Sequence, residues 1–220
     1  MDISNPVVTK ADIKKTANMS DSYAYLRLQR LVQQGKLKKI AKGFYTKQDN
    51  PLLISSHITH PCYISFLAAA QFYGYTEQIP RTIIINATIR KTIHFEGYTL
   101  KFVKQKNIFG YDKIQTTDGE LFIATPEKLL LDMLSSPQHA GNFSETIRII
   151  KQAPLHIPTL KQYLKRINNK SLNKRVGFLL EHYKNIQLPP PKDRNYIELE
   201  QGKQGKKTNT KWRIRHDIEN

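Results

Sequence analysis

One stretch near the start of the chain, Thr9 to Lys47, restricts the fold most, because two short helical patterns meet there at a tight turn. The spacing predicts a helix over Lys10 to Asn18. In the turn that follows, Ser20 or Asp21 can cap the free amides of a second helix. Gly35 suits the left-handed position just after that helix. The second helix carries one apolar stripe, at i, i+4, i+7 and i+8, formed by Ala24, Leu28, Leu31 and Val32.

A basic hairpin is predicted directly after the second helix. Apolar residues recur in two short predicted strands that are joined by a turn at Lys42-Gly43. Lysines lie between and beside these apolar positions. Helix, turn, helix and basic hairpin together predict a winged helix-turn-helix, which places its second helix in the major groove of DNA. A small helical subdomain with an ordinary solvated charged face is the alternative interpretation.

Residues able to reach DNA occupy the polar side of the second helix and the hairpin. Hydroxyls and guanidiniums can contact phosphates and base edges, and the lysines of a wing can lie along the phosphate backbone. The predicted DNA-binding residues are Ser20, Ser22, Tyr23, Arg27, Arg30, Lys36, Lys38, Lys39 and Lys42.

The charge of the chain supports an anionic partner. The 220 residues carry a formal net charge of +17, and nucleic acid is the commonest partner of so basic a protein. Lys and Arg outnumber acids by ten to four in residues 1–60 and by nine to two in residues 137–190, but only by eight to seven in residues 61–136. Cys62 is the single cysteine, and the chain shows no signal peptide or apolar membrane span, so a cytoplasmic location is expected.

The rest of the chain alternates short strands and helices, which predicts an α+β fold: an N-terminal winged helix-turn-helix in residues 1–50 and a mixed α/β C-terminal domain in residues 51–220. Ser65 is expected to cap a helix running to Tyr73. Residues 192–220 are polar and offer no strand core, although Trp212 can dock them. Further predicted elements are a strand at Thr82 to Ala87, hairpins at Ile93 to Lys104 and Ile114 to Ala124, and helices at Thr125 to Ser135 and Phe143 to Gln152.

Two basic helices are predicted near residues 159–185. A second hypothesis for the chain is therefore an interaction protein whose basic helical face binds an acidic protein or an RNA, although simple solvation explains such a face equally well. The possible partner-binding residues are Lys161, Lys165, Arg166, Lys170, Lys174 and Arg175.

Enzymatic interpretations find little support in the sequence. His57 and His60 are three residues apart, but no carboxylate or cysteine stands beside them at ligand spacing, so no metal site is predicted. Thr125, Glu127 and Asp132 fit a helix start better than an acid and base pair, with Lys128 and Asp132 at i, i+4. No glycine-rich nucleotide cradle is present. We therefore predict neither catalysis nor a cofactor.

Several sequence segments of the chain together resemble one known family, the AbiEi antitoxins and transcriptional regulators of type IV toxin–antitoxin systems. The resemblance extends over nearly the whole chain. The segments that carry the resemblance are RLVQQGKLKKIAKGFY, HPCYISFLAAAQFYGYTEQIP, IFGYDK, ATPEKLLLDML and a closing Lys-Trp pair. The most specific feature is HPCYISFLAA followed about 50 residues later by ATPEKLLLD.

The resemblance implies a role in abortive phage defence. It implies that the winged domain binds inverted repeats in double-stranded DNA of its own promoter and represses the operon. It also implies that the second domain counteracts a nucleotidyltransferase-like toxin without forming a stable complex with it.

Overall fold

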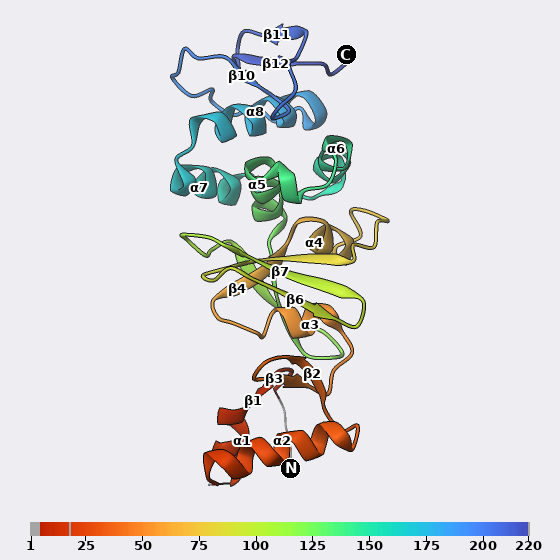
Figure 1. Ribbon diagram of the computed structural model, residues 1–220. Coiled ribbons are helices and arrows are strands. Elements are labelled where there is room, and N and C mark those ends of the chain that lie inside the picture. Colours follow the sequence, from red (N-terminus) through yellow and green to blue (C-terminus); the bar gives the residue numbers. More distant parts are fainter. Residues whose placement is uncertain (1–4, 18, 220) are drawn as a thin grey trace. The chain divides into compact units, whose positions relative to one another are not determined.

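The computed structural model describes residues 5–17 and 19–219, and its described part combines helices with three sheets (Figure 1). The predicted α+β class is confirmed at that level. The chain forms two compact units, Met1–Ile64 with Pro80–Ile123, and Ser65–Ile79 with Ala124–Asn220. The predicted domain boundary near residue 50 stays a prediction.

The N-terminal part of the first unit packs two helices on a small antiparallel sheet of order β1-β3-β2. Ser20 caps the second helix by accepting a hydrogen bond from Tyr23 N at 3.4 Å, and Gly35 follows that helix with φ +67°. The predicted first helix ends at Ala17, and Asn18 lies outside the described residues. The elements are β1 (Val8–Thr9), α1 (Lys10–Ala17), α2 (Asp21–Gln33), β2 (Lys38–Ala41) and β3 (Phe44–Thr46). Their buried core consists of Val8, Ile13, Ala24, Leu28, Leu37 and Tyr45.

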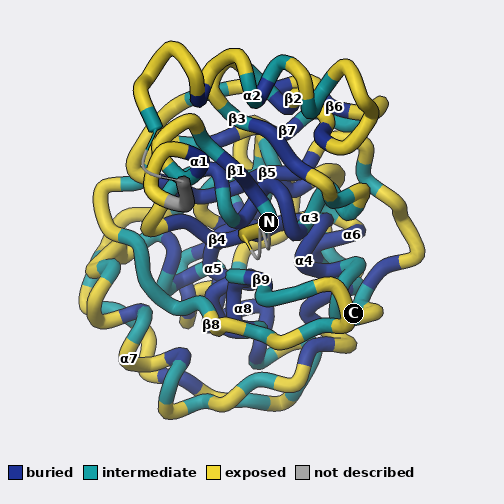
Figure 2. Tube along the Cα trace, turned by 90° about the horizontal axis from the view of Figure 1, so that it is seen from below, coloured by how far each residue is buried: buried dark blue, intermediate teal, exposed yellow. Residues whose placement is uncertain are grey.

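A six-stranded mixed sheet of order β6-β7-β5-β4-β9-β8 follows the short helix α3 (Pro51–Ser55). Both predicted hairpins are confirmed, with turns at Glu96-Gly97 and Asp118-Gly119. Strand β5 is buried at all positions after Thr82, and Figure 2 shows this central part of the sheet in dark blue. The strands are β4 (Cys62–Ser65), β5 (Thr82–Ala87), β6 (Lys91–Phe95), β7 (Tyr98–Lys104), β8 (Tyr111–Gln115) and β9 (Glu120–Ala124).

Strand β4 was not predicted. The sequence suggested only a helix from Ser65, whereas Cys62–Ser65 is a fully buried strand that runs parallel to β9 with Ile64 opposite Ile123. The apolar run from Cys62 to Ile64 is too short to carry a periodicity that separates strand from helix. The helix itself is α4 (Phe66–Phe72), and the Ser65 side chain makes no capping hydrogen bond to it.

The second unit is largely helical and contains the predicted helices. Leucines of α5 and α8 pack with Leu160 and Leu164 in its core. Thr125 caps α5 by accepting a hydrogen bond from Lys128 N at 3.3 Å. Besides α4, its helical elements are α5 (Pro126–Ser135), a 3-10 turn η1 (Pro137–His139), α6 (Phe143–Gln152), α7 (Ile157–Ile167) and α8 (Lys170–Lys184).

The C-terminal segment corrects the expectation of a polar tail without a strand core. It forms a three-stranded sheet of order β10-β12-β11, made of β10 (Ile197–Glu198), β11 (Lys207–Asn209) and β12 (Ile214–His216). The Trp212 side chain, 1% exposed, fills the space beside Gly177 and donates from Nε1 to Glu181 at 2.6 Å. Trp212, with the buried Leu199 and Ile214, thus joins a polar segment to the core, and the docking predicted for Trp212 is confirmed.

Candidate functional site

Helix α2 presents several predicted DNA-binding residues on one side. Ala24 and Leu28 are buried, so the opposite and flanking positions point away from the core. Ser22, Tyr23 and Arg30 are exposed, and Arg27 is half-buried on the same flank. The structure therefore places two hydroxyls and two guanidiniums along one side of a helix of 13 residues.

Two large exposed hydrophobic residues of α2 were not among the predicted site residues. The Tyr25 side chain is 54% exposed and that of Leu26 is 50% exposed. At about 100° per residue, Leu26 lies roughly opposite the middle of the stripe formed by Ala24 and Leu28. A helical projection of the sequence would have shown that Leu26 lies on the side away from the core. Leu26 was missed because leucine is usually taken to be a core residue.

The hairpin lysines fall into two groups. Lys36, Lys39 and Lys42 are exposed. Lys38 is exposed too, but its ammonium lies 2.6 Å from a carboxylate oxygen of Asp49 and 3.5 Å from one of Glu96. The hydrogen bond to Asp49 raises the pKa of the Lys38 ammonium above its usual value. Its charge is therefore partly neutralised within the chain.

Asp21, the acid of α2, is neutralised at the start of the helix. Its two carboxylate oxygens accept from Lys10 at 2.6 Å and Lys14 at 2.7 Å. These hydrogen bonds lower the pKa of Asp21 to about 2. The pairs tie α1 to α2 and leave the surroundings of α2 positive.

Only part of the predicted basic helical face is exposed. Lys161, Lys165, Arg166 and Lys170 are exposed. Lys174, however, is 1% exposed, and its ammonium donates to Asp193 at 2.7 Å and to the carbonyl of Asn195. The placement of Lys174 on a solvated face is thus wrong, because a lysine at a helical polar position is buried here by a carboxylate 19 residues later.

Arg175 is also turned inward, to the end of β10 and the residue that follows it. Its Nε donates to the carbonyls of Glu198 and Leu199, both at 3.1 Å. Burial lowers the pKa of this guanidinium. Arg175 therefore holds the C-terminal sheet, and a role for it in binding a partner stays a prediction.

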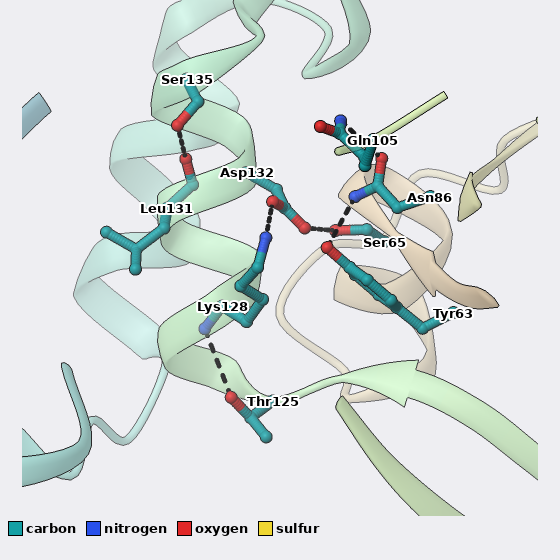
Figure 3. A network of polar contacts seen from close by, with 9 residues as sticks. All are labelled: Tyr63, Ser65, Asn86, Gln105, Thr125, Lys128, Leu131, Asp132 and Ser135. Carbon is teal, nitrogen blue, oxygen red and sulfur yellow. Dashed lines mark hydrogen bonds and ion pairs between the residues drawn. The ribbon is translucent and has the colours of Figure 1, made fainter. Parts of the chain in front are cut away.

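Helix α5 carries a buried polar network in the second unit (Figure 3). Ser65 Oγ donates to Asp132 at 2.8 Å, and the Lys128 ammonium pairs with the other oxygen of the same carboxylate. The predicted i, i+4 pair is confirmed, but Lys128 and Asp132 are only 5% and 6% exposed. Glu127 accepts from the backbone amide of His156 at 2.7 Å, at the start of α7. These hydrogen bonds satisfy buried groups, as a core requires.

The first unit has its own buried polar chain. Asn86 Nδ2 donates to Tyr63 Oη at 3.0 Å, and Gln105 Nε2 donates to Asn86 Oδ1 at 3.1 Å (Figure 3). Near the start of the same unit, His57 and His60 pack with Phe122 as an aromatic cluster. Burial lowers the pKa of the His60 imidazole.

Metal-binding clusters and membrane-spanning helices are both absent from the described residues. Across 5–17 and 19–219, no three His, Cys, Asp or Glu side chains gather closely enough to hold a metal ion. In the same residues, no helix has the length and apolar character needed to cross a membrane.

Comparison with known proteins identifies both a family and a fold. Residues 63–182 match the sequence profile of a family described as the AbiEi antitoxin C-terminal domain. No protein with a curated description matches the chain. The crystal structure of the RV2827C protein from Mycobacterium tuberculosis is similar with a TM-score of 0.67 at 14% identity, covering 96% of this chain and 86% of that one. At that identity the likeness concerns the fold alone.

Proposed function

This chain belongs to the AbiEi antitoxin family, and on that premise we propose that it both represses its own operon and counteracts a cognate toxin. An antitoxin role in a toxin–antitoxin system follows from the family. The proposal adds three finer statements. Residues 1–50 form a winged helix-turn-helix that binds promoter repeats. The toxin is nucleotidyltransferase-like, and residues 51–220 counteract it without a stable complex.

The observation that carries the DNA-binding half is the exposed side of α2 beside an exposed basic hairpin. Tyr23 and Arg30 on α2 and Lys39 and Lys42 on the hairpin are all exposed. In a winged helix-turn-helix the second helix enters the major groove and the wing follows the phosphates. With Asp21 paired to two lysines, no uncompensated acid of α2 opposes that approach.

The first experiment is a footprint of the pure protein on its own upstream DNA, followed by a salt titration. Changing Lys39 and Lys42 together to Ala should weaken binding to any duplex. It should also flatten the slope of log K against log salt by about 0.9 for each phosphate that the variant no longer neutralises. Lys38→Ala is the matched control, with a smaller expected effect, because Asp49 already neutralises that ammonium. A slope unchanged in the double variant would mean that the hairpin does not follow the phosphates.

A second variant tests base reading by Arg27. If its guanidinium pairs with a guanine, Arg27→Ala should cost about 1–3 kcal/mol on the footprinted site and less on random DNA. Equal losses on both duplexes would assign Arg27 to the phosphate backbone. Comparative titrations at one salt concentration measure the difference.

A further inference from the structure

Three large hydrophobic side chains are exposed on α2, and one of them, Leu26, lies opposite the buried stripe of the helix. Leu26 lies two residues from both buried positions Ala24 and Leu28, and its side chain is 50% exposed. Tyr23 and Tyr25 flank it with 50% and 54% exposure. Figure 2 shows exposed turns recurring along α2 in yellow. A helix of this kind has surplus apolar surface directed away from its own core.

The charges on α2 and on the segment that follows it favour an anionic occupant over a second copy of the chain. Arg30 is exposed on α2, and the exposed Lys36, Lys39 and Lys42 follow on the next segment. The acid at the start of the helix, Asp21, is already paired with Lys10 and Lys14. Two such faces would repel one another, whereas a DNA duplex supplies the opposite charge.

Among base edges in the major groove, the apolar group is the C5-methyl of thymine, and apolar side chains contact it. We propose that Leu26 is a specificity-determining residue of α2 and contacts a thymine methyl, so that each half-site holds a thymine facing this side chain. This inference rests on the proposed DNA-binding function and deepens it. The neighbouring lysines would hold the helix in the groove, and Leu26 would select the thymine beside any guanine that Arg27 reads.

Deoxyuridine provides a direct test, because it differs from thymidine only by the missing methyl group. Duplexes of the footprinted site would be prepared with one thymine at a time replaced, and binding to the full-length protein measured by fluorescence anisotropy. At the contacted thymine, affinity should fall by about fourfold, the equivalent of about 0.8 kcal/mol for one buried methyl-sized group. Leu26→Ala should bind the two duplexes equally at that position.

Two controls make the outcome specific. Ile79→Ala removes another exposed aliphatic side chain, 66% exposed and in the second unit, and should retain the full sensitivity to deoxyuridine. Circular dichroism of the Leu26→Ala protein tests whether the variant is folded. The substituted duplexes also test the wild-type protein without any variant.

Several results would overturn the inference. One is equal binding of wild-type protein to every deoxyuridine duplex within a clear footprint, which leaves the DNA-binding function standing. Another is a Leu26→Ala protein that still loses affinity when the contacted thymine is replaced by deoxyuridine. A change from dimer to monomer on Leu26→Ala without DNA would identify a self-association surface instead. Absence of any footprint would reject the proposed function itself.

Discussion

At the scale of single residues, Asp21 is the clearest case of a charge set by its neighbours. Lys10 and Lys14 hold its pKa at about 2, below the ordinary value of 3.8. Because the folded pKa is the lower one, the contribution of Asp21 to stability is present above pH 3.8 and is lost as the pH falls towards 2. Changing both lysines to Ala should bring the pKa back towards 3.8, which NMR titration of the carboxyl measures. Lys15→Ala should leave it unchanged.

Gly177 is a second residue whose role depends on one neighbour. A Cβ built at this position would lie 2.0 Å from the Trp212 ring. Gly177→Ala should therefore displace the ring and destabilise the protein by about 1–3 kcal/mol. Trp212 is the single tryptophan, so its fluorescence should shift to the red as it becomes exposed.

Whether Gly177→Ala lowers or raises the stability of the protein shows whether the Trp212 ring fills the space beside this glycine. Alanine in a helix is favoured over glycine by about 1 kcal/mol, so without the clash the variant would be more stable than the wild type. A stabilised Gly177→Ala protein with unchanged fluorescence would contradict the packing of Trp212 on α8. Lys170→Ala, at the exposed start of the same helix, is the control.

At the scale of elements, α5 depends on its buried ion pair. Lys128→Met would leave the Asp132 carboxylate buried with Ser65 as a partner, and the loss of one member of such a pair costs about 3–5 kcal/mol. Adding Asp132→Leu should recover part of that loss, because it removes the uncompensated charge. Urea unfolding of the single and double variants measures both effects.

An exposed ion pair offers the matched comparison. Lys113 lies 2.7 Å from Glu120, and both side chains are more than 40% exposed. Lys113→Met should therefore change stability far less than Lys128→Met. Equal losses for the two variants would show that burial is not what makes the α5 pair important.

At the scale of the whole molecule, repression and toxin neutralisation should be separable. The protein with Lys39 and Lys42 changed to Ala should lose repression but still rescue cells, because neither change touches residues 63–182, which match the antitoxin family. Growth is measured with the toxin expressed from an unrelated promoter, so that repression cannot mask the outcome. A folded variant that fails to rescue would show that neutralisation needs the DNA-binding surface.

The sequence by itself determined the elements whose signals are local. Helix α2 follows from a cap, an apolar stripe and a terminal glycine within the segment from Ser20 to Gly35. The hairpin at Asp118-Gly119 and the helix begun by Thr125 are likewise specified by neighbouring residues. Such signals act through backbone geometry and hydrogen bonds between near neighbours, so they can be recognised without the rest of the fold.

Only the tertiary structure decided which polar groups are buried. Lys174 and Lys170 occupy one helix and have the same chemistry, yet Lys174 is enclosed with Asp193 while Lys170 is exposed. Strand β4 and Trp212 likewise depend on segments distant in sequence. A charged side chain leaves water when a partner distant in the chain offsets the cost of desolvation, and no local pattern records where that partner will be.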